Sequence, residues 1–247
     1  MYYHLSDHIY ITQFREEYII LDTKKDKYTV CFEQLSKLFS NIFEKNKLHS
    51  KKGLPISDSA YSSQDLGYIQ TLLDNDVIEN KETPYPFYID QKPHSDGVAN
   101  VDWRLPLKNE SVDLSSQVLN AFMTLIRINF YIKAKGLYST IQFIKKSRKN
   151  DSCYIIPQEK ELQNLANIVN KACLMYPTRT KCLEWAMTFV LLALKRGWKC
   201  NLEIGVQNYP FMAHAWVECN GKVVMDSQDL RERLAIILNE PFRKKKL

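Results

Sequence analysis

The sequence predicts an α+β protein with two structural units, and three observations support this fold class. Strand patterns followed by helical periodicity fill residues 1–80. The chain after residue 113 has the opposite order, with helices first and strands last. Between them lies a polar stretch with four prolines and isolated aromatic residues, typical of a linker or a surface strap. We therefore expect domains at residues 1–80 and 114–247, joined by a linker at residues 81–113.

Composition and cysteine spacing exclude several classes of protein. The 247-residue chain is 45% hydrophobic and 25% charged, which is ordinary for a soluble globular protein. No apolar run approaches the ~18 residues of a membrane span, and residues 1–7 lack the basic and apolar regions of a secretory signal. The six cysteines contain no Cys-x-x-Cys pair. We expect a cytoplasmic protein with no membrane span, no metal site, no disulfide framework and no cofactor.

The first unit has the element order of a winged helix-turn-helix. Residues 9–14, 18–22 and 27–31 have the pattern of three short strands separated by polar turns. Apolar residues then recur with a helical period over residues 35–43 and, after a connection at residues 46–63, over residues 66–78. Strands followed by compact helices of this size indicate a winged helix-turn-helix.

Charge argues against the familiar DNA-binding role of that fold. Residues 1–90 carry 10 Lys and Arg against 14 Asp and Glu, a net charge of −4, whereas the rest of the chain carries +10. Binding to nucleic acid needs a basic face that neutralises phosphates. We therefore expect no nucleic-acid partner.

The second unit begins with helices. A long helix is expected over residues 114–135 and ends at Gly136, and further helices are expected over residues 137–146 and 159–174. The next helix starts at Cys182, because apolar residues from Leu183 to Leu194 follow the i, i+3, i+4, i+7 spacing of a helix buried along one face. Helices followed by a sheet are the order of a papain-like or transglutaminase-like domain.

Cys182 is the candidate nucleophile of this unit. Thr180 is the expected N-cap, so the thiol lies in the first helical turn. There the unpaired amide groups and the positive end of the helix dipole favour a thiolate. The alternative is that Cys182 only fills space, because free cysteines are among the most buried residue types.

The candidate partners His214 and Asp226 lie in a predicted hairpin after a strand at residues 198–206. A two-residue Asn220-Gly221 turn would pair Cys219 with Lys222 and send His214 and Asp226 to opposite faces. A three-residue loop would pair Glu218 with Lys222 and set His214 across from Asp226. We predict the three-residue loop, because it also makes an opposite-charge pair. Imidazole can then take the thiol proton while the carboxylate orients the ring.

Motifs around these residues resemble the lasso-peptide maturation proteases, the transglutaminase-like B proteins of lasso-peptide gene clusters. The resemblance covers about residues 115–240. It rests on Cys182-Leu183, Leu191-Leu192, Arg196-Gly197, Ile204-Gly205-Val206, Pro210-Phe211, Ala213-His214-Ala215-Trp216-Val217-Glu218, Gly221 and Asp226. It implies a leader peptidase with Cys182 as nucleophile, His214 as general base and Asp226 as orienting acid. It also implies two partners, a precursor leader peptide and an ATP-dependent macrolactam synthetase.

The first unit is similar to the PqqD-like elements that recognise leader peptides. The implied mode is β-augmentation, in which a leader adds a strand to the edge formed by Lys27, Tyr28, Thr29 and Val30. Apolar leader side chains would then enter a groove lined by Leu66, Ile69 and Leu73. The alternative is that these three residues only fill the core.

Phe211 and Trp216 are candidate cleft residues, since one precedes the histidine strand and the other shares the face of His214. Burial alone would also explain Trp216. Two rival functions stay open beside hydrolysis of the leader–core bond. The thioester that Cys182 would form with the leader could react with an amine instead of water, as in transglutaminase-like acyl transfer. Alternatively, the protein could be a non-catalytic scaffold that presents the precursor to the synthetase.

Overall fold

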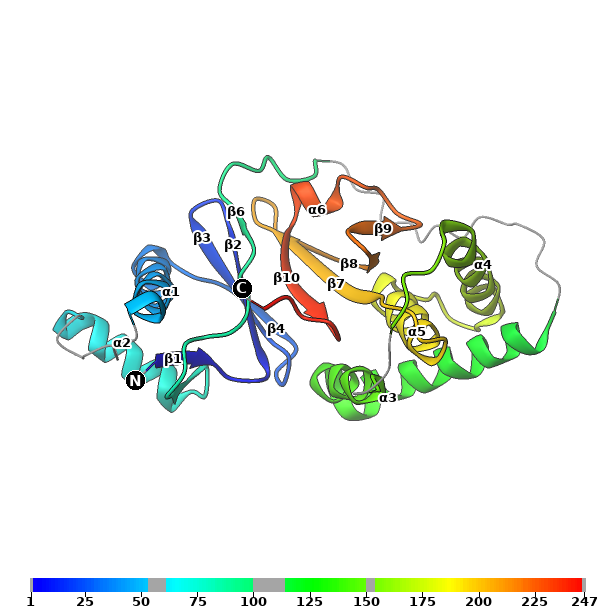
Figure 1. Cartoon of the computed structure of the whole chain (residues 1–247), viewed down its shortest axis with the longest axis horizontal. Helices are drawn as coiled ribbons and strands as arrows, with labels where there is room; N and C mark the ends of the chain where they lie inside the picture. Colours follow the sequence, from blue (N-terminus) through cyan, green and yellow to red (C-terminus); the bar gives the residue numbers. More distant parts are fainter. Residues whose placement is uncertain (1, 53–60, 100–113, 150–153, 246–247) are drawn as a thin grey trace.

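The computed structural model describes residues 2–52, 61–99, 114–149 and 154–245, with side chains omitted for residues 45–52. Figure 1 shows its layers in sequence: helices α1 and α2, a first sheet, a second sheet, and the helices α3 to α5. Mixed helices and sheets agree with the predicted α+β class. In the described part of the chain, no helix is long and apolar enough to cross a membrane.

The first sheet has the strand order β4-β3-β2-β6. Strands β2 (Ile9–Phe14), β3 (Glu17–Asp22) and β4 (Lys27–Val30) form an antiparallel meander at the three predicted positions. Strand β6 (Gln91–Lys92) adds to the other side, parallel to β2. Strand β4 is therefore an edge strand, paired on one side only among the described residues.

Helices α1 (Glu33–Lys52) and α2 (Ser63–Asp74) cover one face of this sheet. Ser62 begins α2 with a capping box, since its hydroxyl accepts from Asp65 N and the Asp65 carboxylate accepts from Ser62 N. Two short strands that the sequence pattern did not predict, β1 (Tyr2–Leu5) and β5 (Ile78–Lys81), pair beside them. Residues 53–60 of the predicted connection lie outside the described residues.

The first sheet is buried on both faces because successive strand residues point in opposite directions. Tyr18 and Ile20 of β3 pack with α1 and α2, whereas Ile19 and Leu21 belong to the core of the second unit. Tyr10 and Phe14 of β2 reach the same second core. The two units therefore share this sheet.

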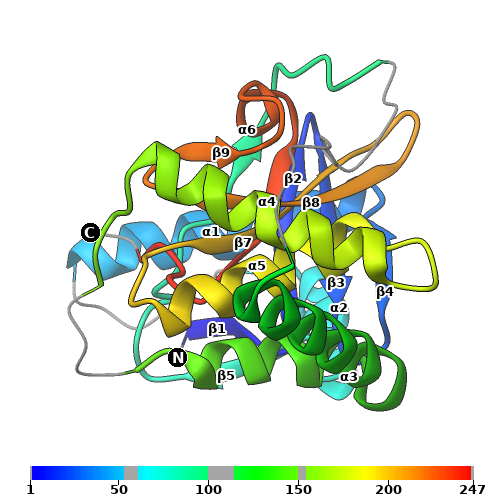
Figure 2. The same cartoon turned by 90° about the vertical axis from the view of Figure 1, so that its right-hand side faces the viewer.

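Helices α3 and α4 form the outer layer of the second unit and cover a third helix, α5. Helix α3 (Ser116–Ser147) bends sharply at Gly136, whose φ of 78° and ψ of 173° interrupt the helix where the sequence predicted a stop. Helix α4 (Glu159–Met175) and α3 lie in front of helix α5 (Cys182–Lys195) in Figure 2. Residues 150–153, including Cys153, lie outside the described residues.

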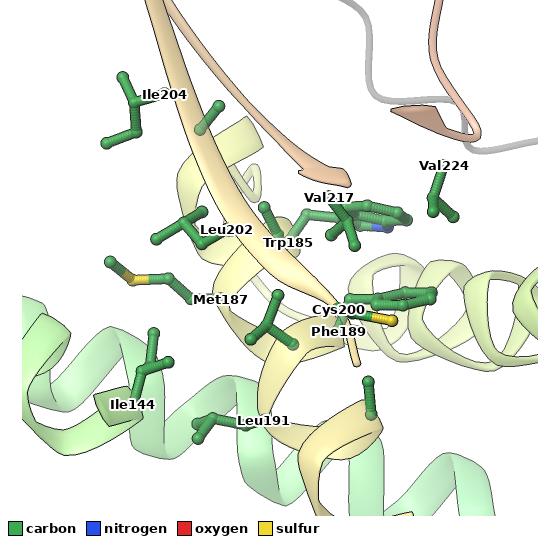
Figure 3. Close-up of a cluster of buried hydrophobic side chains, with 14 of the residues drawn as sticks. Ile144, Trp185, Met187, Phe189, Leu191, Cys200, Leu202, Ile204, Val217 and Val224 are labelled. Carbon is green, nitrogen blue, oxygen red and sulfur yellow. The ribbon is translucent and has the colours of Figure 1, made fainter. Parts of the chain in front are cut away.

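Helix α5 is the centre of the fold, and here the expectation of one buried face was wrong. Every residue from Trp185 to Leu194 is buried. Helices α3 and α4 cover one side of α5 while the second sheet covers the other, so no side is left for solvent. Figure 3 shows Leu191 beside α3 and Phe189 beside Cys200, so α5 contributes side chains in more than one direction.

The second sheet has the order β10-β7-β8-β9 and is antiparallel throughout. Strands β7 (Asn201–Gln207), β8 (Met212–Cys219) and β9 (Lys222–Val224) agree with the predicted extended runs. Helix α6 (Leu230–Arg233) and strand β10 (Ala235–Glu240) follow, and β10 packs against β2 of the first sheet.

The described part of the predicted linker, residues 81–99, is packed against both units. Tyr85 and Ile89 lie in the first core, and the Asp90 carboxylate accepts a 2.8 Å hydrogen bond from Ile236 N of β10. The backbone of Val98 exchanges two hydrogen bonds with the side chain of Gln207 at the end of β7. The rest of that linker, residues 100–113, lies outside the described residues.

Candidate active site

Cys182 is the first residue of α5, as the sequence predicted, but the residue that caps the helix is different. The N-cap is Lys181, whose N–H donates a 2.7 Å hydrogen bond to the Glu184 carboxylate. Thr180 is buried, and its hydroxyl makes no capping hydrogen bond to the helix. The thiol of Cys182 lies in the first helical turn, next to the amide groups that have no partner in the helix.

The turn that follows His214 corrects the predicted register. Cys219 pairs with Lys222 through a two-residue turn in which Asn220 (φ 51°) and Gly221 (φ 87°) are both left-handed, as a type I′ turn requires. The predicted pairing of Glu218 with Lys222 does not form, because Glu218 lies opposite Val223. Its carboxylate instead accepts from Gly221 N inside the turn.

His214 and Asp226 are adjacent all the same, because the second strand of the hairpin stops early. Strand β9 ends at Val224, and Met225 adopts a left-handed conformation with φ of 57°. This turn brings the carboxylate of Asp226 back to the face that His214 occupies. Nε2 of His214 lies 2.8 Å from Oδ2 of Asp226. The prediction that His214 and Asp226 are neighbours is therefore correct, but the three-residue loop that was predicted to bring them together is wrong.

The Cys182 thiol and the His214 imidazole shift each other's pKa. Burial raises the pKa of the Cys182 thiol, but the hydrogen bond and positive charge of His214 outweigh it, and the net pKa lies below the usual value. Burial lowers the pKa of His214, yet its bonds to Asp226 and Cys182 raise it to about 9. The site therefore favours a thiolate next to an imidazolium.

Cys31 and Cys173 differ from Cys182 in the direction of their pKa shift. Burial raises the pKa of Cys31 to about 12 and that of Cys173 to about 11. Cys200 and Cys219 lie close enough to share a hydrogen bond between their thiols. Among the described residues, no group of three or more His, Cys, Asp and Glu side chains is arranged to hold a metal ion.

Trp216 supports His214 from inside the fold and does not line a cleft. It is only 1% exposed, and its ring centre lies 6.0 Å from that of His214. Gly205 of β7 lies opposite His214 and leaves room for the Trp216 ring. A Cβ at Gly205 would lie 2.7 Å from Cζ3 of Trp216 and 2.9 Å from Cβ of Leu234. The prediction of Trp216 as a cleft residue is therefore corrected, and burial explains it.

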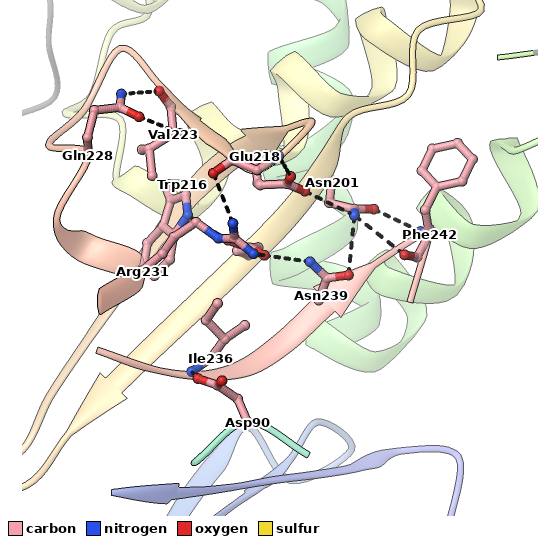
Figure 4. A network of polar contacts seen from close by, with 12 residues as sticks. Asp90, Asn201, Trp216, Glu218, Val223, Gln228, Arg231, Ile236, Asn239 and Phe242 are labelled. Atoms are coloured by element: carbon pink, nitrogen blue, oxygen red, sulfur yellow. Dashed lines mark hydrogen bonds and ion pairs between the residues drawn. The ribbon is translucent and has the colours of Figure 1, made fainter. Parts of the chain in front are cut away.

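A buried polar network behind Trp216 could not be predicted from the sequence, because Glu203 alternates with the apolar residues Leu202 and Ile204 as a solvent-facing strand residue would. Glu203 has no exposed surface, and burial raises its pKa. Its carboxylate accepts hydrogen bonds from Trp216 Nε1 (3.0 Å), Arg231 Nε (3.0 Å) and Asn239 Nδ2 (2.6 Å) (Figure 4). Arg231 also donates to Gly221 O at 2.9 Å, which ties α6 to the hairpin turn.

Phe211, the other predicted cleft residue, directly precedes β8. It is 42% exposed, and its ring centre lies 5.3 Å from that of Tyr28 on edge strand β4. Tyr28 in turn interacts electrostatically with Cys182. Glu17 holds the loop before β8 in place, because its carboxylate accepts 2.7 Å hydrogen bonds from Asn208 Nδ2 and Tyr209 Oη. Neither hydrogen bond of Glu17 could be predicted from the sequence, because each joins residues about 190 positions apart.

The predicted leader-binding residues fall into different environments. On β4, Lys27 and Thr29 are exposed while Tyr28 and Val30 are half-buried. On α2, Leu66 is 36% exposed and Leu73 is half-buried. Ile69 is only 3% exposed and packs in the first core, which is the alternative that the sequence left open.

Two aromatic residues that the sequence did not single out, the exposed Phe32 and the half-buried Tyr68, lie near the predicted groove. Phe32, just after β4, is 53% exposed. Its ring centre lies 6.0 Å from that of Tyr68 on α2, at an edge-to-face angle. Leu66 on the same helix adds a third apolar side chain at the surface.

Comparison with known proteins gives a family match over the part of the chain that holds this site. The model of the Transglutaminase-like superfamily matches residues 124–239, the stretch that contains Cys182, His214 and Asp226. The chain is 24% identical over 234 residues to the Microcin J25-processing protein McjB of Escherichia coli. The aligned region covers 92% of this chain and 96% of that protein. No solved structure gives a significant match. Residues 124–239 therefore form a transglutaminase-like domain, and the resemblance to lasso-peptide maturation proteases that the motifs indicated is confirmed.

Proposed function

We propose that this protein is the leader peptidase of a lasso-peptide pathway and hydrolyses the bond between leader and core through Cys182, His214 and Asp226. The observation that carries the proposal is the helix-start thiol of Cys182 next to the 2.8 Å His214–Asp226 pair, with a lowered thiol pKa and a raised imidazole pKa. The name of McjB as a peptide-processing protein supports the same reaction class.

In the first half of the reaction, the Cys182 thiolate attacks the carbonyl carbon of the scissile peptide bond and forms a C–S bond. The developing oxyanion meets the Cys182 N–H at the start of α5. The imidazolium of His214 then gives its proton to the leaving nitrogen as the C–N bond breaks. The core peptide leaves with a free amine, and the leader remains as a thioester on Cys182.

In the second half, neutral His214 takes a proton from water, whose oxygen attacks the thioester carbon. The C–S bond breaks, the leader leaves with a carboxylate, and the thiolate–imidazolium pair is restored. Asp226 holds Nε2 throughout, which fixes the orientation of the ring and stabilises its positive form. The freed core amine is the group that a separate ATP-dependent macrolactam synthetase would join to an acidic side chain in the cytoplasm.

For leader recognition we propose β-augmentation at β4, with residues 1–80 as a PqqD-like winged-helix domain. Cys31 N donates to Tyr18 O of β3, so residues 27, 29 and 31 turn their backbone groups toward β3. The backbone groups of Tyr28 and Val30 therefore point to the open edge, where a leader strand finds its partners. Side chains of that strand alternate between two sides.

The two sides of such a strand have different neighbours. One side faces the apolar residues Phe32, Leu66 and Tyr68 near α2. The other faces the Tyr28–Phe211 pair, which belongs to the approach to Cys182. A leader bound at β4 is therefore held in register by one set of side chains and directed to the thiol by the other.

The cleavage test is the intact mass of a precursor peptide after incubation with wild-type protein, Cys182→Ala and Cys173→Ala, with and without the synthetase. We expect cleavage at one bond by wild type and by Cys173→Ala, whose thiol is buried with a raised pKa, and no cleavage by Cys182→Ala. A leader product whose mass equals that of the hydrolysed leader plus an amine minus one water would indicate acyl transfer. An intact precursor with all three proteins would favour the scaffold.

Leader binding is tested with Val30→Pro. Proline removes the outward N–H of Val30 but no donor that β3 uses, and edge strands tolerate proline at such positions. One lost backbone hydrogen bond of about 0.5 to 1.5 kcal/mol predicts a roughly 2- to 12-fold rise in the leader Kd. Leu66→Glu should also weaken binding, whereas the exposed Glu16→Gln should not. Equal affinity of Val30→Pro and wild type would count against the β4 edge.

A further inference from the structure

An apolar face of α3 is left on the surface, on the side of the helix that does not pack into the core. The first segment of α3 buries Val118, Ala121, Leu125 and Ile128. A second stripe of large apolar side chains follows the same helical spacing and is exposed. Its members are Leu119 (58%), Met123 (57%), Ile126 (37%) and Phe130 (62%). Contiguous apolar surface of this kind typically marks an interaction site.

The stripe borders a hollow. The bend at Gly136 turns the second segment of α3 sharply away from the first (Figure 1). The C-terminal end of α5 forms the remaining wall of the hollow. A groove of about 660 Å³ lies there, lined by Met123, Ile126 and Phe130 on one side and by Phe143 and Leu191 on the other. Because the hollow is concave, it fits inserted side chains better than a flat surface.

The charges around the groove have one sign. Helix α3 has five Lys and Arg residues in 32 positions and no Asp or Glu. Arg127 lies at the groove with its guanidinium 4.5 Å from the centre of the Phe143 ring, and Lys195 of α5 lies at the end. A second copy of this chain would bring another basic rim against the first, since a two-fold contact pairs a surface with itself.

We propose that this groove binds an acidic amphipathic helix of a partner protein. Its apolar face would fill the elbow, and its carboxylates would meet Arg127 and Lys195. Lys195 is 13 residues along α5 from Cys182, about 20 Å at 1.5 Å per residue, so the groove is separate from the candidate active site. The inference does not depend on the proposed peptidase activity.

The test measures the Kd of two synthetic helices for the full-length protein by fluorescence anisotropy. Both peptides carry Leu at i, i+3, i+4 and i+7; one carries Glu on its remaining face and the other carries Lys. We expect the acidic peptide to bind wild type at least tenfold more tightly than its basic twin. Phe130→Glu should weaken that binding at least tenfold, whereas Ile155→Glu, a change at an equally exposed apolar residue elsewhere, should leave it unchanged.

Four outcomes would overturn the proposal. Equal binding of the two peptides would remove the charge argument, and no binding of either would remove the site. Sedimentation that gives a dimer for wild type and a monomer for Phe130→Glu would make the face a self-interface. Binding to phosphatidylglycerol vesicles that requires Phe130, without preference for the acidic helix, would make it a membrane contact. Since Phe130 is exposed, thermal unfolding should be the same for wild type and variant.

Discussion

Replacing Met225 with valine is expected to separate Asp226 from His214 while the Asn220-Gly221 turn stays in place. Met225 has a φ of 57°, and a left-handed conformation costs an L-residue roughly 1 to 2 kcal/mol, more for a β-branched side chain. Valine relieves this strain most readily by taking up extended backbone. Strand β9 then continues in its register, in which residue 227 lies opposite His214 and Asp226 points to the other face.

The magnitude follows from the bond that is lost. The 2.8 Å contact of Asp226 with His214 is a charge-assisted hydrogen bond, worth roughly 1.5 to 3 kcal/mol. At about 1.4 kcal/mol per factor of ten, kcat/KM for precursor cleavage should fall roughly 10- to 100-fold. The rate of Cys182 alkylation by iodoacetamide at neutral pH should fall with it.

Met225→Gly is the matched control, because glycine adopts a positive φ at no steric cost. It should keep wild-type kcat/KM, and Asp226→Asn should reproduce the loss seen with Met225→Val. Wild-type activity together with wild-type stability in Met225→Val would refute the reasoning, as would an equal loss in Met225→Gly.

Three further predictions concern the same region. The kcat/KM profile should rise with pH as Cys182 loses its proton below the usual thiol pKa and fall near pH 9 as His214 loses its own; a single ascending limb would contradict this. Gly205→Ala should lower the free energy of unfolding in urea by about 1 to 3 kcal/mol through overpacking, whereas Gly67→Ala, with open space around it, should not lower it. Glu17→Ala should reduce kcat/KM about tenfold by freeing the loop before β8, and an equal loss in Glu16→Ala would exclude that cause.

The elements of the site could be predicted because local pattern determines them. Apolar spacing places Cys182 at a helix start, and alternation places His214 on a strand. The hairpin register could not be read in the same way. The sequence Asn220-Gly221 favours the two-residue turn that the structure has, but only the left-handed backbone of Met225, a residue with no such preference, makes that turn compatible with Asp226.

What the sequence could not reveal depends on contacts between distant residues. Glu203 has the position of a solvent-facing residue in its strand, and it is buried because Arg231 and Asn239 from a later helix and strand meet it there. The Tyr28–Phe211 pair likewise joins the two units. Such partners leave no periodic signal in either segment.

The sheet that both units share limits how such proteins can be recombined. Tyr10, Phe14, Ile19 and Leu21 lie on the first unit's strands, yet they fill the second unit's core. A chain cut at the strap would present these four apolar side chains to water on one fragment and leave matching voids in the other. Exchange of the first unit between relatives should therefore succeed only when the grafted sheet brings a complementary set of residues at these four positions.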